Sequence, residues 1–366
     1  MRKAFIYVDN LRLGGFQRLA LDQAYALSDR GLEVHVNVLS PSATWTLAEL
    51  ECELVESKQI TISEFPASRS SLAKKIHSQI NSIENPLIIS HSLRSTFALR
   101  VLRTSFGGNY TIHTTLHQLP GLTDPVQRFK RLIYAQFTDR LFCFSYGVKY
   151  SWENQFSFPY SSVFMKKTKK ITVLRNGIYL ERLPSISTRK QTDRRPQIVF
   201  LGRLAFWKGL ATIEKLGTSR DLEGFDFLFM IPGSDSSSFD EFTRLLGERV
   251  KVVKGKTISS YAPKHGDVHI YPANYGRDVK IVESISLNCL EMASIGIPSV
   301  VSSNGMMTWP EFMNSKFFAE VNWSDIPSVV GQILESSLIS IDDSDISTIR
   351  SLTSIENQID EFLKMP

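Results

Sequence analysis

The sequence predicts an α/β protein made of two doubly wound domains, each built on a parallel sheet. Short runs rich in β-branched and aromatic residues alternate with segments whose apolar residues recur every three or four positions, which is typical of parallel sheets covered by helices. The alternation begins twice, because a second series of strands starts near residue 196. With 366 residues, the chain is long enough for two domains of common size.

The first series contains five expected strands with helices between them. These strands are KAFIYVD, EVHVNVL, PLIIS, YTIHTTL and RLFCFS. The segment FQRLALDQAYALSDRG has the hydrophobic period of a helix, and Gly31 is placed to end it. We expect this domain to span residues 1–183.

The second series follows a segment typical of an interdomain linker. PSISTRKQTDRRP is polar, bracketed by prolines and without a hydrophobic period, although its basic residues could instead bind phosphate. The expected strands after it are QIVFLG, DFLFMIP, RVKVVKG, DVHIYP and IPSVVSS, in a domain spanning 184–351. Because open α/β sheets bind ligands at the carboxyl ends of their strands, we expect the site in a cleft between the domains.

Composition and charge narrow the class of partner. The net charge of +5 suits a phosphorylated metabolite, an acidic membrane surface or nucleic acid. Nucleic acid is not expected, since the aromatic residues are embedded in strand and helix patterns.

No apolar run reaches the roughly 20 residues of a membrane-spanning helix, and the first residues turn polar too soon for a signal peptide, so we expect a cytoplasmic protein. The three cysteines lack metal-ligand spacing and are expected to be reduced packing residues.

Two features near expected strand ends can bind an anion. Gly14 and Gly15 precede the first helix, where close backbone approach and free N–H groups favour a phosphate; the alternative is a tight turn. Arg203 and Lys208, in GRLAFWKGL, follow the strand QIVFLG and suit a diphosphate; the alternative is two surface cations. The first turn is not the GxGxxG fingerprint, and no acidic residue closes the second strand, so a nicotinamide cofactor is disfavoured.

The segment VESISLNCLEMASIGIPSVVSS carries two carboxylates, Glu283 and Glu291. Glu291 lies within a helix that is expected to begin after Ser286 or Leu287, and the start of that helix can present backbone amides to phosphate. An ionised Glu291 can accept both hydroxyls of a ribose, which would place Glu283 nearer the transferred group.

Together these motifs resemble the retaining GT-B glycosyltransferases, especially glycosyltransferase family 4 (group 1 type). The resembling features are the Gly-Gly turn, GRLAFWKG and E-x7-E ahead of GIPSVV. NGIY resembles the family's hinge motif, with Tyr179 in place of the usual aspartate, and Ser284-Ile285-Ser286 stand where glycines are usual. Two strands resemble family strands that end in histidine, here His91 and His117. The resemblance extends from residue 5 to about residue 335.

The resemblance implies a GT-B fold, with two Rossmann-like domains facing a central cleft and a final helix, about 352–366, packing back on the first domain. It implies transfer of a hexosyl group from a UDP or GDP sugar to a saccharide or lipid-linked saccharide, with retention and without an obligatory metal or cofactor. Synthesis of cell-surface polysaccharide or lipopolysaccharide is the expected context. The expected catalytic residues are His117, Arg203, Lys208 and Glu283. The expected donor-binding residues are Gly14, Gly15, Arg203, Lys208, Glu283, Ser284, Ile285, Ser286, Leu287, Asn288 and Glu291.

Other hypotheses remain open beside this one. The missing loop glycines and Tyr179 suit a noncatalytic, degenerate partner subunit, and the same fold also suits a sugar-nucleotide epimerase. The basic and apolar segments DPVQRFKRLIYAQFTDRLF and SVFMKKTKK could dock on anionic lipid at the inner face of the cell membrane; the alternative is a core-facing amphipathic helix. His113, inside a strand, is expected to be scaffold. Asp343-Ser344-Asp345 matches a DxD metal motif, but its polar segment predicts a helix-capping turn.

Overall fold

The chain forms two compact units in the computed structural model. Unit 1 comprises Met1–Tyr179 and Ile355–Pro366, and unit 2 comprises Leu180–Ser354. The boundary thus lies at Tyr179, where we expected residue 183. The structure describes residues 2–9, 11, 15–39, 49–65, 76, 78–80, 83–108, 110–117, 130, 133–135, 137–156, 171–184, 193–202, 209–231, 247–254, 258–272, 286–302, 310–313 and 315–364.

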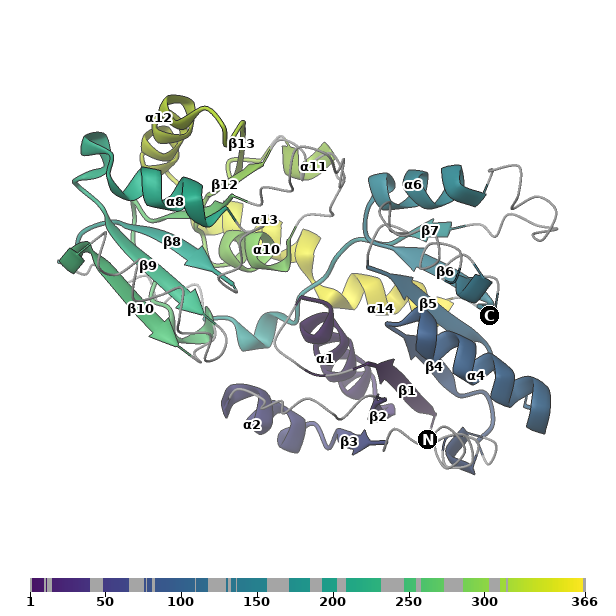
Figure 1. The fold of residues 1–366 in the computed structure, drawn as a ribbon. Helices are drawn as coiled ribbons and strands as arrows, with labels where there is room; N and C mark the ends of the chain where they lie inside the picture. Colours follow the sequence, from purple (N-terminus) through teal and green to yellow (C-terminus); the bar gives the residue numbers. More distant parts are fainter. Residues whose placement is uncertain are drawn as a thin grey trace. The chain divides into compact units, whose positions relative to one another are not determined.

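Unit 1 contains a seven-stranded parallel sheet in the order β3-β2-β1-β4-β5-β6-β7 (Figure 1). Its strands are β1 (Lys3–Val8), β2 (Glu33–Val38), β3 (Thr61–Glu64), β4 (Leu87–Ser90), β5 (Ile112–Leu116), β6 (Arg140–Cys143) and β7 (Ile171–Val173). The central strands β1, β4 and β5 are almost completely buried, because helices cover both faces of the sheet.

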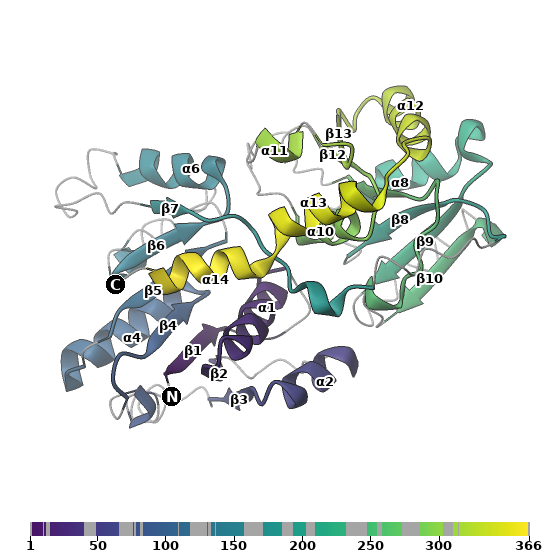
Figure 2. The same ribbon diagram turned by 180° about the vertical axis from the view of Figure 1, so that it is seen from behind.

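The helices of unit 1 pack on opposite faces of this sheet. They are α1 (Gly15–Asp29), α2 (Glu49–Ser57), α4 (Leu93–Phe106), α6 (Tyr146–Phe156) and α14 (Ile355–Lys364). Figure 2 shows α14 beside α1 on one face, where Phe362 contacts His113 and Phe142. Trp152 of α6 packs on the other face, against Leu141 and its neighbours. His113 is therefore core scaffold, as we expected.

Unit 2 contains a six-stranded parallel sheet in the order β10-β9-β8-β11-β12-β13. Its strands are β8 (Gln197–Leu201), β9 (Asp226–Ile231), β10 (Val250–Lys254), β11 (Val268–Tyr271), β12 (Ser299–Ser302) and β13 (Phe318–Val321). Its helices are α8 (Leu210–Gly217), α10 (Leu287–Ser294), α11 (Pro310–Met313), α12 (Ile326–Ser337) and α13 (Asp343–Thr353), with 3-10 turns η1 (Leu180–Arg182), η4 (Arg220–Leu222), η5 (Gly247–Arg249) and η6 (Ile258–Ser260). Helices α8 and α12 share one apolar core with the sheet.

All ten strands expected from the sequence are present, and three others were missed. The missed strands β3, β7 and β13 are short, with three or four residues each, and all lie at sheet edges. Strand β3 has no fully buried position, so it carries no hydrophobic pattern to detect. The capping turn is confirmed, because Asp342 and Asp345 form a reciprocal capping box at the start of α13.

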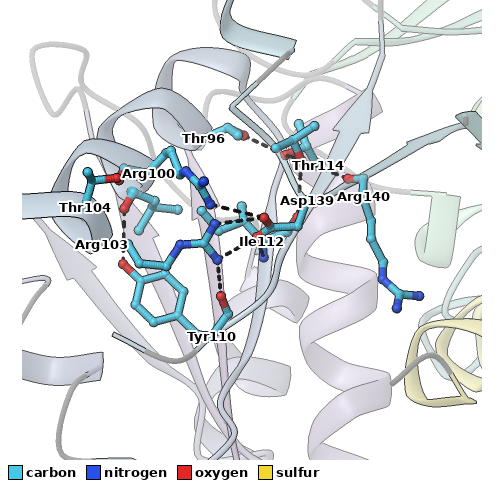
Figure 3. Close-up of polar contacts among 11 residues, drawn as sticks. Thr96, Arg100, Arg103, Thr104, Tyr110, Ile112, Thr114, Asp139 and Arg140 are labelled. Atoms are coloured by element: carbon cyan, nitrogen blue, oxygen red, sulfur yellow. Dashed lines mark hydrogen bonds and ion pairs between the residues drawn. The ribbon is translucent and has the colours of Figure 1, made fainter. Parts of the chain in front are cut away.

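A polar cluster fixes the amino ends of β5 and β6 in unit 1 (Figure 3). Asp139 accepts two hydrogen bonds from Arg103, at 2.7 and 2.8 Å, and one from the backbone N–H of Ile112 at 2.8 Å. Thr96 and Thr138 hydrogen-bond the hydroxyl of Thr114 beside it. Because this cluster lies at the opposite end of the strands from the expected site, its role is to hold the scaffold.

Two further findings concern the cysteines and the helices. Cys143 and Cys289 are buried, as we expected, whereas Cys52 lies on the exposed side of α2, so the prediction of a packing role is wrong for Cys52.

Within the described ranges, no helix has the length and hydropathy needed to cross a bilayer.

Candidate functional site

In unit 1, the two histidines at strand ends lie against each other. His91 follows β4 and His117 follows β5, which are neighbouring parallel strands, so both side chains reach the same edge of the sheet. Their rings stack at 5.1 Å, and Nδ1 of His91 lies 2.8 Å from Nε2 of His117. Phe16, the second residue of α1, packs its ring 5.4 Å from His117. The structure thus brings His117 close to the start of the helix that Gly15 begins.

Burial disfavours the charged form of both histidines. Burial lowers the pKa of His117 to about 3, and it lowers the pKa of His91 well below its usual value, with His117 adding to the effect. A neutral histidine at a ligand-binding edge offers hydrogen bonds rather than positive charge. His117 is therefore suited to orient a hydroxyl group, not to neutralise a phosphate.

Asp9 is a further polar residue at this edge that sequence reasoning missed. It follows β1 directly, ahead of the Gly-Gly turn. Burial raises its pKa, although a hydrogen bond with Ser92 and the charge of Arg94 act in the opposite direction. Its Oδ1 is buried, and no residue that the structure describes forms a hydrogen bond with it. The sequence could have indicated Asp9 as a candidate, because this acidic residue directly follows an expected strand and open α/β sheets bind ligands at the carboxyl ends of their strands.

In unit 2, the start of α10 is fixed against the end of β8. Ser286 is the N-cap, as we predicted, and its hydroxyl accepts a hydrogen bond from the backbone N–H of Asn288 at 3.3 Å. The side-chain amide of Asn288 donates to the carbonyl oxygen of Leu201 at 2.5 Å. A Cβ at Gly202, whose φ is 140°, would lie 3.2 Å from that amide. The start of α10 and the end of β8 are therefore adjacent, and this contact gives Asn288 a structural role, while its role in donor binding stays a prediction.

Glu291 is buried in the body of α10 and pairs with an arginine that the motifs did not reveal. Its side chain forms an ion pair with Arg182 of η1, and the two residues are only 1% and 3% exposed. One carboxylate oxygen thus already has a charged partner in unit 2. The role of Glu291 as a ribose ligand stays a prediction, and the structure adds a scaffold role to it.

The last residue of GRLAFWKG, Gly209, occupies a position that requires glycine. It precedes α8 with a φ of 74°, and a Cβ placed there would lie 2.1 Å from the carbonyl oxygen of Pro272, at the end of β11. We expect Gly209→Ala to destabilise the protein by about 3 kcal/mol, because it combines left-handed strain with a backbone collision. Urea denaturation measures this. Gly224→Ala is the matched control, since its Cβ would meet nothing within 4 Å, and equal losses in both variants would contradict the argument.

Tyr179, which stands where the family has aspartate, is a packing and hydrogen-bonding residue of unit 1. Its hydroxyl donates to Asp29 at 2.7 Å, and Lys58, which pairs with Asp29 at 2.5 Å, lies 5.4 Å from the centre of its ring. These contacts give Tyr179 a structural role in unit 1.

Several predicted site residues lie outside the described residues. They are Gly14, Arg203, Lys208, Glu283, Ser284 and Ile285. Their roles stay predictions, as does the cleft between the units. Within the part of the chain that the structure describes, no three histidine, cysteine or acidic side chains are grouped as a metal site would require.

Comparison with solved structures shows the fold class. The apo form of the lipopolysaccharide outer core galactosyltransferase WaaB has a TM-score of 0.63 and 15% identity, over 99% of each chain. HepE (Alr3699) of Anabaena in complex with UDP-glucose has a TM-score of 0.67 and 14% identity, over 100% of both chains. The N-terminal domain of trehalose-6-phosphate phosphatase from Candida albicans has a TM-score of 0.63 and 12% identity, over 99% of this chain and 96% of that one.

The chain has the GT-B fold, with two domains that are each built on a parallel sheet, as in WaaB and HepE. No protein-family model matches the chain, and no curated protein matches it in sequence. At these identities the likeness defines the fold, and the activity has to be argued from the site.

Proposed function

We propose that the protein transfers a hexosyl group from a nucleoside diphosphate sugar to a saccharide or lipid-linked saccharide, with retention at the anomeric carbon. The observation that carries this is the fixed start of α10 beside the end of β8. The positive end of the α10 helix dipole and the charges of Arg203 and Lys208, which follow β8 in the sequence, would together attract a diphosphate. UDP is the favoured nucleotide, since the HepE structure contains UDP-glucose.

In this proposal the two units supply different groups. Arg203 and Lys208 neutralise the diphosphate as it leaves, Glu283 and the 284–288 segment hold the sugar, and Glu291 holds the ribose. Of the two groups expected for His117, the sugar and the reacting phosphate, a sugar hydroxyl suits its neutral ring better. The acceptor oxygen bonds to the anomeric carbon as the bond from that carbon to the phosphate oxygen breaks, and the leaving phosphate takes the acceptor's proton. Cell-surface polysaccharide or lipopolysaccharide synthesis fits this chemistry and the WaaB likeness.

Thermal-shift titration tests the donor class. A nucleoside diphosphate or its sugar conjugate at about 100 times its dissociation constant adds about 2.7 kcal/mol to the free energy of unfolding. We expect one member of a panel of UDP, GDP, CDP and ADP compounds to raise the melting temperature. If no member of the panel binds, the hypothesis of a noncatalytic partner subunit is favoured over that of a transferase. An epimerase is recognised separately, because it consumes the sugar nucleotide without an acceptor.

We expect Arg203→Ala to lower the transfer rate by about 100-fold, which corresponds to about 3 kcal/mol of lost transition-state stabilisation. The physical reason is that charge grows on the diphosphate as the bond to the sugar breaks. Steady-state transfer of labelled sugar measures the effect. Lys215→Ala, an exposed cation on α8, is the control and should leave the rate unchanged. An unaltered rate in Arg203→Ala would remove the diphosphate assignment.

A lipid-linked acceptor would bring the protein to a membrane surface through the basic segments of unit 1. Sedimentation with neutral and anionic vesicles tests this directly. Binding to anionic vesicles alone supports the proposal, whereas equal and negligible binding to both kinds removes the membrane contact.

A further inference from the structure

Four buried or partly buried side chains form a continuous hydrogen-bond path through unit 1. Gln358 of α14 accepts from the amide of Gln23 of α1 at 2.7 Å, and Gln23 in turn lies 2.8 Å from Nε2 of His91. The path continues from Nδ1 of His91 to Nε2 of His117 at 2.8 Å. It begins at a backbone group, because Gln358 also donates to the carbonyl oxygen of Arg175 at 3.0 Å.

That carbonyl group sets the direction of every hydrogen bond in the path. A carbonyl oxygen can only accept, so the amide nitrogen of Gln358 faces Arg175 and its oxygen faces Gln23. Gln23 must then present its nitrogen to Gln358 and its oxygen to Nε2 of His91, which therefore carries a proton. In a neutral His91 the other nitrogen, Nδ1, has a lone pair and accepts from Nε2–H of His117.

We infer that Gln358, Gln23 and His91 are positioning residues that hold His117 as its Nε2–H tautomer, so that Nδ1 of His117 faces the site as a hydrogen-bond acceptor. Over the described ranges, no hydrogen bond to this Nδ1 is found. The aromatic rings of Phe16 and Phe144 also pack on the His117 ring, with centroid distances of 5.4 Å each. An acceptor nitrogen such as this Nδ1 recognises a hydroxyl group. If the proposed function holds, on which this assignment rests, that hydroxyl belongs to the donor sugar.

Burial supports this arrangement. It lowers the pKa of His91 and of His117, so neither ring is protonated at neutral pH. A protonated His91 would donate from Nδ1 as well as from Nε2, so Nε2 of His117 would have to accept and its proton would move to Nδ1. Gln23 is fully buried and Gln358 is 2% exposed, which leaves no solvent to replace a lost partner.

Nuclear magnetic resonance of isotope-labelled histidine nitrogens in the full-length protein tests the inference without any ligand. The wild-type spectrum is expected to show His117 as the Nε2–H tautomer alone, with its signals assigned from their loss in His117→Asn. An Nδ1–H tautomer would overturn the inference, whatever the protein transfers. His113 serves as an internal control, because its ring lies outside the path and packs on Phe142 and Phe362.

Two variants test whether the path causes the tautomer. Gln23→Glu places a carboxylate beside His91, which favours a proton on both of its nitrogens, so His117 must accept through Nε2 and switch to Nδ1–H. Gln358→Met frees the amide of Gln23 to turn, so both tautomers of His117 should appear. Unchanged His117 signals in both variants would overturn the positioning role, while His113 signals at their wild-type positions show that the fold is intact.

The ligand is tested in a separate arm with UDP-glucose as the probe. Binding should shift the Nδ1 signal of His117 in the wild type, and Gln23→Glu should bind it about fivefold more weakly, as expected for one neutral hydrogen bond. A second outcome is that His117 shows the expected tautomer but its signals do not respond to UDP-glucose or to the other sugar nucleotides. This result would overturn the ligand assignment and count against the proposed function. The positioning role of Gln358, Gln23 and His91 would still stand.

Discussion

Replacing Arg182 by leucine is expected to lower the free energy of unfolding by about 3 kcal/mol or more. Its partner Glu291 is 1% exposed, so the substitution leaves a carboxylate buried in the core of unit 2 without its cation. Urea denaturation, followed by circular dichroism, measures the loss. Glu291→Gln should also destabilise the protein, because it leaves the guanidinium of Arg182 without its counter-charge.

The double variant Arg182→Met/Glu291→Leu separates charge from packing. It removes both charges together, so it should recover most of the stability that either single change costs. Lys364→Met is the control, since Lys364 and Glu361 pair on the surface with side chains 69% and 51% exposed, and its effect should stay within about 0.5 kcal/mol. Full stability in Arg182→Leu, together with lost nucleotide binding, would contradict the scaffold role and favour a ligand-binding role for the pair.

Lowering the pH is expected to lower the free energy of unfolding already between about pH 6.5 and 5, above the range in which carboxylates usually titrate. Burial lowers the pKa of His113 to about 4, lowers the pKa of His117 and His269 to about 3, and lowers the pKa of His91 well below its usual value. Between these values and about pH 6.5, the unfolded chain binds protons that the folded chain does not, so the free energy of unfolding falls as the pH falls. Each histidine contributes about 1.4 kcal/mol per pH unit within that window.

Chemical denaturation at a series of pH values between 7 and 5 measures this slope. His113→Phe is the informative variant, because His113 already packs among Phe142 and Phe362 and its replacement removes one titrating group. The slope should then decrease by about 1 kcal/mol per pH unit on average over this range, because the unfolded histidine is only partly protonated near pH 7. Stability that stays constant from pH 7 to pH 5 in the wild type would show that these histidines are protonated in the folded protein.

The fold was largely predictable because its central strands carry their own signal. KAFIYVD and QIVFLG are buried on both faces, and a continuous apolar run identifies such strands regardless of tertiary context. The edge strands could not be found in the same way. Thr61–Glu64 has no fully buried residue, and Ile171–Val173 has only three residues, so both become strands only because a neighbouring strand offers hydrogen bonds.

The candidate site was predictable where chemistry coincides with a strand or helix end. His91 and His117 end two expected strands, and Ser286 is a recognisable N-cap. The partner of Glu291 was not predictable, because Arg182 lies 109 residues earlier in the chain and pairs with it only through folding of unit 2. Gln23 and Gln358 lie 335 residues apart, and each looks like an ordinary polar helix residue in the sequence.

The discontinuity of unit 1 has a consequence for how the newly made chain folds. Ile355–Pro366 is synthesised after the whole of unit 2, yet Phe362 belongs to the core of unit 1 beside His113 and Phe142. Arg30 also has to await Glu356 and Asp360 for its ion pairs at 2.7 and 2.6 Å. During translation, unit 2 can therefore close its core first, whereas unit 1 keeps the part of its apolar sheet that α14 covers exposed until α14 has left the ribosome.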